Sequence, residues 1–286
     1  MMLKKIENFV LNSRHHNRAF GVDITWNSDQ KVIKPLAIFM HGYKGFKNWG
    51  AFDLMAESFA HAGLPFLKFN FSHNGTSTEL PMEFSDLEAF GANTLSIELD
   101  DLETVLHAVE SDVFSGFDNI VARQEFFLIG FSRAGANAII QASRDSRIKK
   151  LVTWNAVPDF AWRWQNKQEM KDWKEKGVRF EKNTRTGQVM PLYYSIVQDY
   201  FDNISSYEVL RQAQLVYQPW LVVHARDDEA VPFKSGLILS ELNSNAVFYP
   251  VENSWHTFGT SHPHTEVELP TAFQQVVDQT ILFLNS

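Results

Sequence analysis

The chain has 286 residues, of which 44% are hydrophobic and 21% charged, and these values are typical of a folded globular protein rather than a disordered one. Its formal net charge of −8 disfavours nucleic acid as a partner, because phosphate binding needs a basic surface. The absence of cysteine excludes disulfides and thiolate chemistry. No segment approaches the roughly 18 apolar residues of a membrane span, and the N-terminus lacks a continuous apolar signal region, so we expect a cytoplasmic protein. No feature of the sequence indicates an oligomeric state.

Two strands are predicted near the N-terminus, over residues 6–11 and 19–26, and we expect them to form an antiparallel edge of a sheet. Apolar runs predict further strands at residues 36–40, 65–71, 126–129, 150–154, 220–224 and 246–249. Helices are predicted at residues 52–62, 93–109, 136–142, 234–242 and 271–284. Because strands alternate with helices, we predict an α/β fold with a mainly parallel sheet and helices on both faces. Functional sites in such sheets lie at the carboxyl ends of the strands.

Residues 158–218 interrupt this alternation. They are rich in aromatic residues, and residues 161–185 carry eight Lys and Arg against four Asp and Glu. A helix is predicted over residues 161–176, followed by a hairpin with strands at residues 178–180 and 188–190. We interpret the segment as a cap inserted over the site, which divides the chain into a core of residues 1–157 and 219–286 and a cap of residues 158–218. The alternative is an insertion that packs elsewhere on the sheet with a solvated basic face.

Residues 125–140, EFFLIGFSRAGANAII, predict a strand, a sharp turn of small residues and a helix, with Ser132 at the apex of the turn. Gly130 and Ala134 are small enough to let the strand and the helix pack closely. A serine becomes a nucleophile only beside a base, and the base needs a carboxylate to orient it. Both follow later predicted strands: the acid lies in HARDDEAVP, at Asp227 or Asp228, and His256 lies in NSWHTF.

With these motifs the chain resembles the α/β-hydrolases, and within them the dienelactone-hydrolase-like and prolyl-oligopeptidase-like group of serine esterases, over nearly its whole length. The resemblance implies the α/β-hydrolase fold with an inserted cap. The group's pattern H-G-x-x-D-x-x-V-P, with Ala225 in place of its glycine, places the acid at Asp228. Only the spacing to the Val-Pro pair separates Asp228 from Asp227. The catalytic residues implied are Ser132, Asp228 and His256.

The same resemblance implies an oxyanion hole. His41-Gly42-Tyr43 matches the group's loop after its third strand, so the backbone N–H of Tyr43 is one implied donor and that of Arg133, directly after the serine, is the other. We expect the His41 imidazole to bond to loop backbone.

Further pocket residues are expected on both sides of the serine. Ser72 and His73 could form a second pair of serine and base, but adjacent residues on a turn rarely face each other. We therefore expect His73 to line the substrate pocket, together with Trp162, Trp164 and Tyr194 of the cap.

Three histidines near the C-terminus, His256, His262 and His264, suggest a metal site as an alternative. No histidine pair with i, i+4 spacing and a flanking carboxylate accompanies them. We expect no metal and no cofactor.

The predicted function is a serine hydrolase that cleaves a small-molecule carboxylic ester through an acyl-enzyme on Ser132. The aromatic cap indicates an apolar or aryl acyl group, as in the cinnamoyl-type esterases of this fold, and its lysines and arginines indicate a carboxylate-bearing substrate. The alternatives are an acyltransferase or peptidase with the same triad, and a hydrolase-fold binding protein without turnover.

Overall fold

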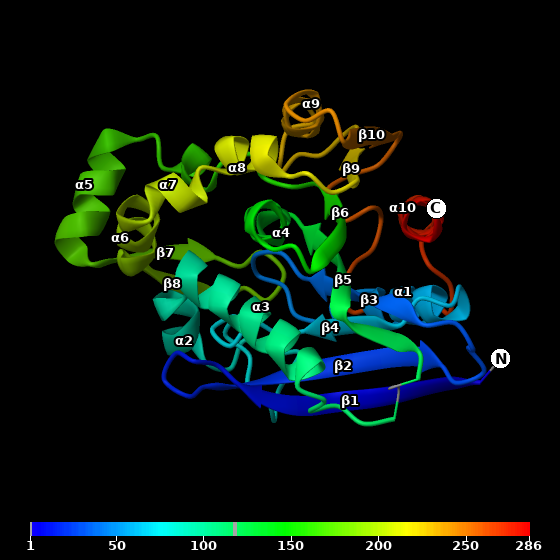
Figure 1. Cartoon of the computed structure of the whole chain (residues 1–286). Helices are drawn as coiled ribbons and strands as arrows, with labels where there is room; N and C mark the ends of the chain where they lie inside the picture. Colours follow the sequence, from blue (N-terminus) through cyan, green and yellow to red (C-terminus); the bar gives the residue numbers. More distant parts are fainter. Residues whose placement is uncertain (1, 117–118) are drawn as a thin grey trace.

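An eight-stranded sheet with the order β1-β2-β4-β3-β5-β6-β9-β10 forms the centre of the computed structural model, which describes residues 2–116 and 119–286 (Figure 1). β1 is antiparallel to β2, and β2 is antiparallel to β4, whereas the other neighbours pair in parallel. The predicted antiparallel edge and mainly parallel sheet are confirmed. The strands of this sheet are β1 (Leu3–Asn12), β2 (Ala19–Asn27), β3 (Lys34–Met40), β4 (Phe66–Phe69), β5 (Val121–Phe131), β6 (Ile148–Trp154), β9 (Trp220–Ala225) and β10 (Ala246–Val251).

Helices cover both faces of the sheet because its central strands carry apolar residues in both directions. In β3, Leu36 and Ile38 join the core beneath α3 (Leu95–Glu110) and α4 (Arg133–Arg144), while Phe39 joins the core beneath α1 (Phe52–His61) and α10 (Thr271–Asn285). Successive side chains of a strand point to opposite faces, so an unbroken apolar run requires a cover on each side. The helix α9 (Lys234–Glu241) follows β9.

Local capping sets two helix boundaries that periodicity alone does not give. The Thr94 side chain accepts a hydrogen bond from the Ile97 N–H at 3.3 Å, so α3 begins two residues later than predicted. A short helix that we did not predict, α2 (Leu87–Ala92), precedes it and is capped by Asp86, which accepts from the Ala89 N–H at 2.9 Å. Six residues are too few to show a helical repeat.

Residues 158–218 contain more structure than one helix and a hairpin. The helix predicted over residues 161–176 is interrupted, because the Asn166 side chain accepts hydrogen bonds from the N–H groups of Gln168 and Glu169 and starts a new helix. The elements present are a 3-10 helix (Phe160–Arg163), α5 (Lys167–Lys176), the antiparallel hairpin of β7 (Val178–Lys182) and β8 (Val189–Tyr193), α6 (Ser195–Asp202), α7 (Ile204–Tyr207) and α8 (Val209–Leu215).

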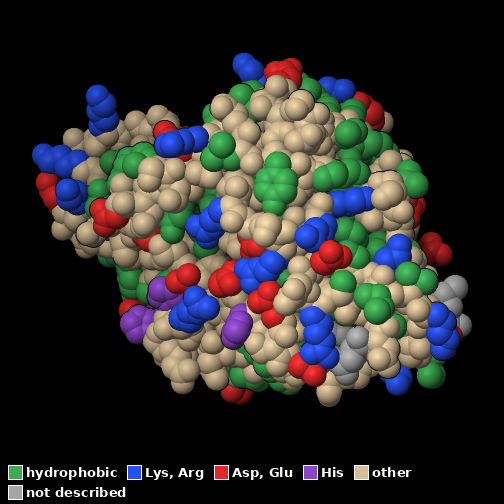
Figure 2. Space-filling model, in the orientation of Figure 1, with side chains coloured by type: hydrophobic (Ala, Val, Ile, Leu, Met, Phe, Trp, Pro, Cys, Tyr) green, Lys and Arg blue, Asp and Glu red, His purple; other side chains and the backbone are tan. Residues whose placement is uncertain are grey.

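A third apolar cluster joins this segment to the rest of the chain. It packs Phe46 and Phe90 against Trp173 of α5, Leu192 of β8 and Ile196 of α6. In Figure 1, α5, α6, β7 and β8 form a lobe next to α2. Figure 2 shows several basic side chains on the part of the surface that this lobe occupies, with acidic ones among them, and Lys171 of α5 is 67% exposed. Part of the basic charge of the segment is therefore solvated.

Both outer strands of the sheet, β1 and β10, carry features that interrupt a regular edge. β1 changes register between Ile6 and Phe9, and its Lys4 and Lys5 are exposed. At the opposite edge, β10 pairs with β9 and carries Pro250 within the strand.

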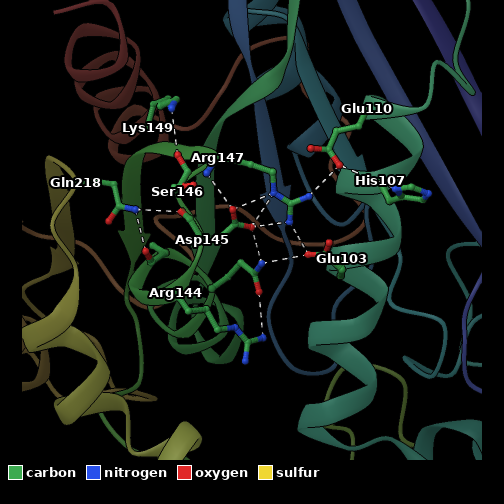
Figure 3. A network of polar contacts seen from close by, with 11 residues as sticks. Glu103, His107, Glu110, Arg144, Asp145, Ser146, Arg147, Lys149 and Gln218 are labelled. Carbon is green, nitrogen blue, oxygen red and sulfur yellow. Dashed lines mark hydrogen bonds and ion pairs between the residues drawn. The ribbon is translucent and has the colours of Figure 1, made fainter.

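An ionic network centred on Arg147 joins α3 to the turn before β6 (Figure 3). The guanidinium donates to Glu103 at 2.7 Å, to Glu110 at 3.0 Å and to Asp145 at 2.7 Å. Burial raises the pKa of the Asp145 carboxyl, but the hydrogen bonds from Arg147 outweigh it, and the pKa lies below its ordinary value of 3.8. The Asp145 side chain is 8% exposed, so it depends on this partner.

We expect Arg147→Met to lower the free energy of unfolding by about 2 kcal/mol at pH 7, because it leaves a buried carboxylate unpaired. A carboxyl whose pKa is lowered by folding stabilises the folded state at pH values above its ordinary pKa. This contribution is lost as the pH falls through the pKa that the carboxyl has in the folded state. The difference between variant and wild type should therefore shrink below about pH 4. Urea unfolding of both proteins at pH 7 and pH 3 measures this difference in the free energy of unfolding. Lys149→Met, at a side chain 42% exposed, is the control, and an equal loss in both variants would contradict the prediction.

Candidate active site

Ser132 occupies the turn between β5 and α4 with a backbone conformation of φ 58° and ψ −121°. Such a left-handed conformation is strained for a residue with a side chain and needs support from its surroundings. Its N–H donates to the Trp154 carbonyl at 2.8 Å, and its carbonyl accepts from the Gly135 N–H at 3.0 Å. A Cβ on Gly130 would collide with the Ala134 carbonyl oxygen, and one on Gly135 would lie 2.5 Å from the Ala156 Cβ. Close packing beneath the serine thus requires these two glycines.

Three side chains from separate loops meet at this turn. The His256 Nε2 lies 3.0 Å from the Ser132 Oγ, and its Nδ1 lies 2.7 Å from the Asp228 Oδ2. A neutral ring with its proton on Nδ1 fits both contacts, because Nδ1–H then donates to the carboxylate and Nε2 accepts from the hydroxyl. This is the arrangement by which a histidine removes a serine proton.

The acid loop holds Asp228 by its second oxygen. Asp228 Oδ1 accepts hydrogen bonds from the N–H groups of Ala230 at 2.8 Å and Val231 at 2.7 Å. His224 lies beneath the loop, where its Nε2 lies 3.0 Å from the Val231 carbonyl and can donate to it, and burial lowers the pKa of His224. The neighbouring Asp227 is exposed.

Asn155 joins two of these loops, although the sequence did not single it out. It is fully buried with a φ of 48°, a region that asparagine tolerates. Its Nδ2 donates to the His256 carbonyl at 2.7 Å, and its Oδ1 accepts from the Ala225 N–H at 2.8 Å. One side chain thus connects the end of β9 with the histidine loop.

The loop after β3 passes directly beside the serine. A Cβ on Gly42 would lie 2.9 Å from the Ser132 Cβ, so the backbone that leads to Tyr43 is close to the nucleophile. Arg133 is the first residue of α4, where an N–H has no intrahelical acceptor. The His41 Nδ1 lies 2.9 Å from the Gly42 carbonyl, as expected of a residue that bonds to loop backbone, and burial lowers the pKa of His41 to about 4.

A cavity of about 450 Å³ opens over Ser132 and His256. Its aromatic wall consists of Tyr43, Phe160, Trp162, Trp164 and Trp173. Its charged lining consists of Lys44, Arg133, Asp159, Arg163, Arg179 and Glu181. The segment 158–218 supplies most of both sets, including Trp162 and Trp164.

His73 and Tyr194 differ from the prediction, because neither belongs to the cavity lining found among residues 2–116 and 119–286. Tyr194 packs edge-on against Trp173, with ring centroids 5.9 Å apart. The His73 Nδ1 lies 2.8 Å from the Ser72 Oγ, so these adjacent residues do face each other, contrary to our expectation. Both are buried, and burial lowers the pKa of His73 to about 4.

The C-terminal histidines contact different groups instead of converging. His262 Nδ1 accepts from the Gly50 N–H at 3.1 Å, while His264 Nε2 lies 3.0 Å from the Glu268 carbonyl. Within the described ranges, no group of three or more His, Asp or Glu side chains is arranged to hold a metal ion. No helix in the described parts of the chain is both long and apolar enough to cross a bilayer.

Comparison with known proteins gives a match in structure only. No family model and no curated protein matches the sequence. Among solved structures, the mouse α/β hydrolase domain-containing protein 10 aligns with a TM-score of 0.68 at 15% identity, covering 100% of this chain and 99% of that one. Est1E from Butyrivibrio proteoclasticus, solved with ferulic acid bound, aligns with a TM-score of 0.65 at 16% identity over 96% and 98% of the two chains. An esterase domain from a Rhodothermus marinus protein aligns with a TM-score of 0.61 at 14% identity over 99% and 100%.

The sheet order, the helices on both faces and these alignments show that the chain has the α/β-hydrolase fold. The predicted fold class is confirmed. At identities of 14–16%, these alignments show a shared fold and do not show a shared function.

Proposed function

We propose that the protein is a serine hydrolase that cleaves carboxylic esters through an acyl-enzyme on Ser132. The observation that carries the proposal is the continuous chain of contacts from the Ser132 Oγ through both nitrogens of His256 to Asp228. The HARDDEAVP and His256 motifs favour the dienelactone-hydrolase-like group within the fold.

In the proposed reaction, His256 Nε2 takes the hydroxyl proton while the Ser132 Oγ attacks the ester carbonyl carbon. The tetrahedral intermediate then collapses, the carbon–oxygen bond to the alcohol breaks, and His256 returns the proton to the leaving alkoxide. Water attacks the acyl-enzyme by the same steps in the second half. Asp228 holds the Nδ1 proton throughout and stabilises the charged ring.

The developing oxyanion would be bound by the backbone N–H groups of Tyr43 and Arg133. Two features support this assignment: Gly42 packs against the Ser132 Cβ, and Arg133 lies at the N-terminus of α4, where the helix dipole favours negative charge. Each donor of this kind contributes about 3 kcal/mol to transition-state stabilisation.

We further propose that residues 158–218 form a cap that selects an aryl acyl group. Trp162, Trp164 and Trp173 supply the aromatic wall, and flat rings favour a flat aromatic ligand by stacking. The structure solved with ferulic acid bound shows that a protein of this fold accommodates such a molecule. A substrate that bears a carboxylate is the second candidate, because the basic side chains of Lys44, Arg163 and Arg179 belong to the cavity lining.

A panel of esters of one alcohol, with either an acetyl or an aryl acyl group and with or without a carboxylate on the aryl ring, tests the function. We expect hydrolysis of aryl esters at a rate well above buffer, with release of the free acid. If added alcohols or amines received the acyl group in preference to water, the protein would be an acyltransferase, and cleavage of peptides alone would indicate a peptidase.

Trp162→Ala should raise the KM for a bulky aryl ester about tenfold and change the kinetics of acetyl esters by less than twofold, since only the aryl group uses this contact. Steady-state kinetics on both esters measure the difference. Tyr194→Phe is the control, because this ring lies outside the described cavity lining. A similar effect of Trp162→Ala on both esters would count against a selective cap.

A further inference from the structure

One carboxylate in the cavity wall, that of Glu181 in β7, receives donors from two distant parts of the chain. Its Oε1 accepts from Arg179 at 2.8 Å. Its Oε2 accepts from the Lys44 Nζ at 3.1 Å and from the Tyr43 hydroxyl at 3.3 Å. Tyr43 and Lys44 belong to the loop after β3, whereas Glu181 belongs to the hairpin of the segment 158–218. Glu181 therefore joins the loop beside Ser132 to the hairpin above it.

The rest of this loop is held by its own contacts. On one side, His41 bonds to the Gly42 carbonyl, which also accepts from the Gly45 N–H at 3.1 Å. On the other side, the Lys47 N–H donates to the Asn70 side chain at 2.7 Å. Tyr43 and Lys44 lie between these points. In the part of the chain that the structure describes, their side chains donate hydrogen bonds to Glu181.

Two further observations point to a restrained loop. Lys44 has a φ of 57°, a conformation that a lysine keeps only when its surroundings hold it. The Tyr43 ring lies 5.6 Å from the Phe90 ring and 5.2 Å from the Arg133 guanidinium. Burial and the nearby Glu181 carboxylate raise the pKa of the Tyr43 hydroxyl, so it remains a protonated donor. These contacts hold the Tyr43 ring at its hydroxyl and over its face, and so restrain the backbone to which the ring is attached.

We propose that Glu181 is a positioning residue for the oxyanion site: by accepting from Tyr43 and Lys44, it holds the Tyr43 N–H at the place where the negative charge develops. The inference rests on the proposed function, because it assigns a second residue to the same reaction. It also makes the hairpin part of the catalytic apparatus, beyond its contribution to the pocket wall. Glu181 acts through Tyr43 and needs no contact with the substrate.

The alternative is an ion pair that only fastens the hairpin to the core. The two possibilities predict different effects when the Glu181 contacts are removed. A fastening contact affects stability and leaves kcat alone, whereas misplacing an oxyanion donor lowers kcat with little change in KM, because that donor binds the transition state more strongly than the substrate.

The experiment compares Glu181→Ala and Glu181→Gln with Phe180→Ala, a variant of the neighbouring residue of β7, which is 62% exposed on the outer face of the hairpin. The readouts are kcat and KM for a benzoate ester and the inhibition constant of phenyl trifluoromethyl ketone, which carries the same aryl group beside its carbonyl carbon. The Ser132 Oγ forms a bond to the carbonyl carbon of this ketone while its proton passes to His256, and the oxyanion formed needs the same donors as the tetrahedral intermediate.

We expect Glu181→Ala to lower kcat by about 10- to 100-fold, because removing an oxyanion donor outright costs about 10²–10³. KM should stay within about threefold, and ketone inhibition should weaken by the same factor as kcat. Glu181→Gln should recover most of the activity, since its amide oxygen still accepts from Tyr43 and Lys44. Phe180→Ala should match wild type.

Unchanged kcat and ketone inhibition in Glu181→Ala, whether or not its thermal stability falls, would overturn the inference. A change confined to KM would also overturn it and make Glu181 a substrate contact. If Glu181→Ala does not fold, Tyr43→Phe takes its place, because it removes only the hydroxyl that reaches Glu181, and its kcat should fall in the same way. Ester hydrolysis that persists in Ser132→Ala would refute the proposed function itself, a result distinct from a Ser132-dependent activity that Glu181 does not affect.

Discussion

A fluorophosphonate probe should add once to the wild-type chain and not at all to Ser132→Ala. Phosphonylation requires an activated serine, and the Ser132 Oγ lies 3.0 Å from an imidazole that is itself oriented by a carboxylate. Intact-mass analysis measures the adduct. In a serine protease, loss of the nucleophile lowers kcat by about 10⁶, so ester hydrolysis by Ser132→Ala should fall to near the background rate.

The matched control is Ser72→Ala. Ser72 is also buried with its hydroxyl 2.8 Å from an imidazole, that of His73, but it does not belong to the cavity lining of the described chain. This variant should keep both the adduct and the activity. If labelling is lost in Ser72→Ala instead of Ser132→Ala, the nucleophile is Ser72, with His73 as its base. A wild-type protein that takes no label at all would favour the hydrolase-fold binding protein.

Asp228→Asn should lower kcat by about 10⁴, equivalent to about 5 kcal/mol of barrier, as the same change does in the serine proteases. Asp228 Oδ1 accepts from two backbone N–H groups, so the oxygen of an asparagine would take that place and its NH₂ would face His256. The ring would then turn its Nδ1 lone pair toward the amide and carry its proton on Nε2, where it cannot accept the Ser132 proton.

Asp227→Asn is the paired control, one residue away on the same loop. Asp227 is exposed, and loss of a surface carboxylate changes stability by less than about 1 kcal/mol, so activity should remain within several-fold of wild type. Circular dichroism on both variants establishes that they are folded. The reverse pattern would assign the acid to Asp227, and near-normal activity in both would mean that it comes from another strand.

The strands of the sheet could be predicted because a strand that is buried on both faces has an unbroken run of apolar residues. β3 and the buried end of β5 are unbroken apolar runs, and each is covered on both sides in the structure. Residues 158–218 gave weaker signals. There the helix boundary depends on a single capping side chain, Asn166, and the short helices α6 to α8 bury their apolar residues against tertiary neighbours that the sequence does not reveal.

For the candidate site, the order of the motifs indicated Ser132, an acid at Asp227 or Asp228, and His256, because each follows a strand and parallel strands end at one edge of the sheet. Only the spacing to the Val-Pro pair, taken from the family pattern, favoured Asp228. Their catalytic roles remain proposals. The direction of a side chain on a loop was harder to predict, as His73 and Tyr194 illustrate. Asn155 and Glu181 could not be selected from the sequence, because the His256 carbonyl and the Tyr43 hydroxyl that they contact lie far away along the chain.

The register shift in β1 and the proline in β10 bear on how the protein behaves at high concentration. An open sheet of this kind has two rows of unpaired backbone groups, which could pair with a neighbouring molecule and begin aggregation. Along β10, Pro250 removes an N–H from that row. Along β1, the irregular register between Ile6 and Phe9 and the charges of Lys4 and Lys5 oppose the approach of a second flat strand. Both margins of the sheet are thus protected against growth into a larger intermolecular sheet.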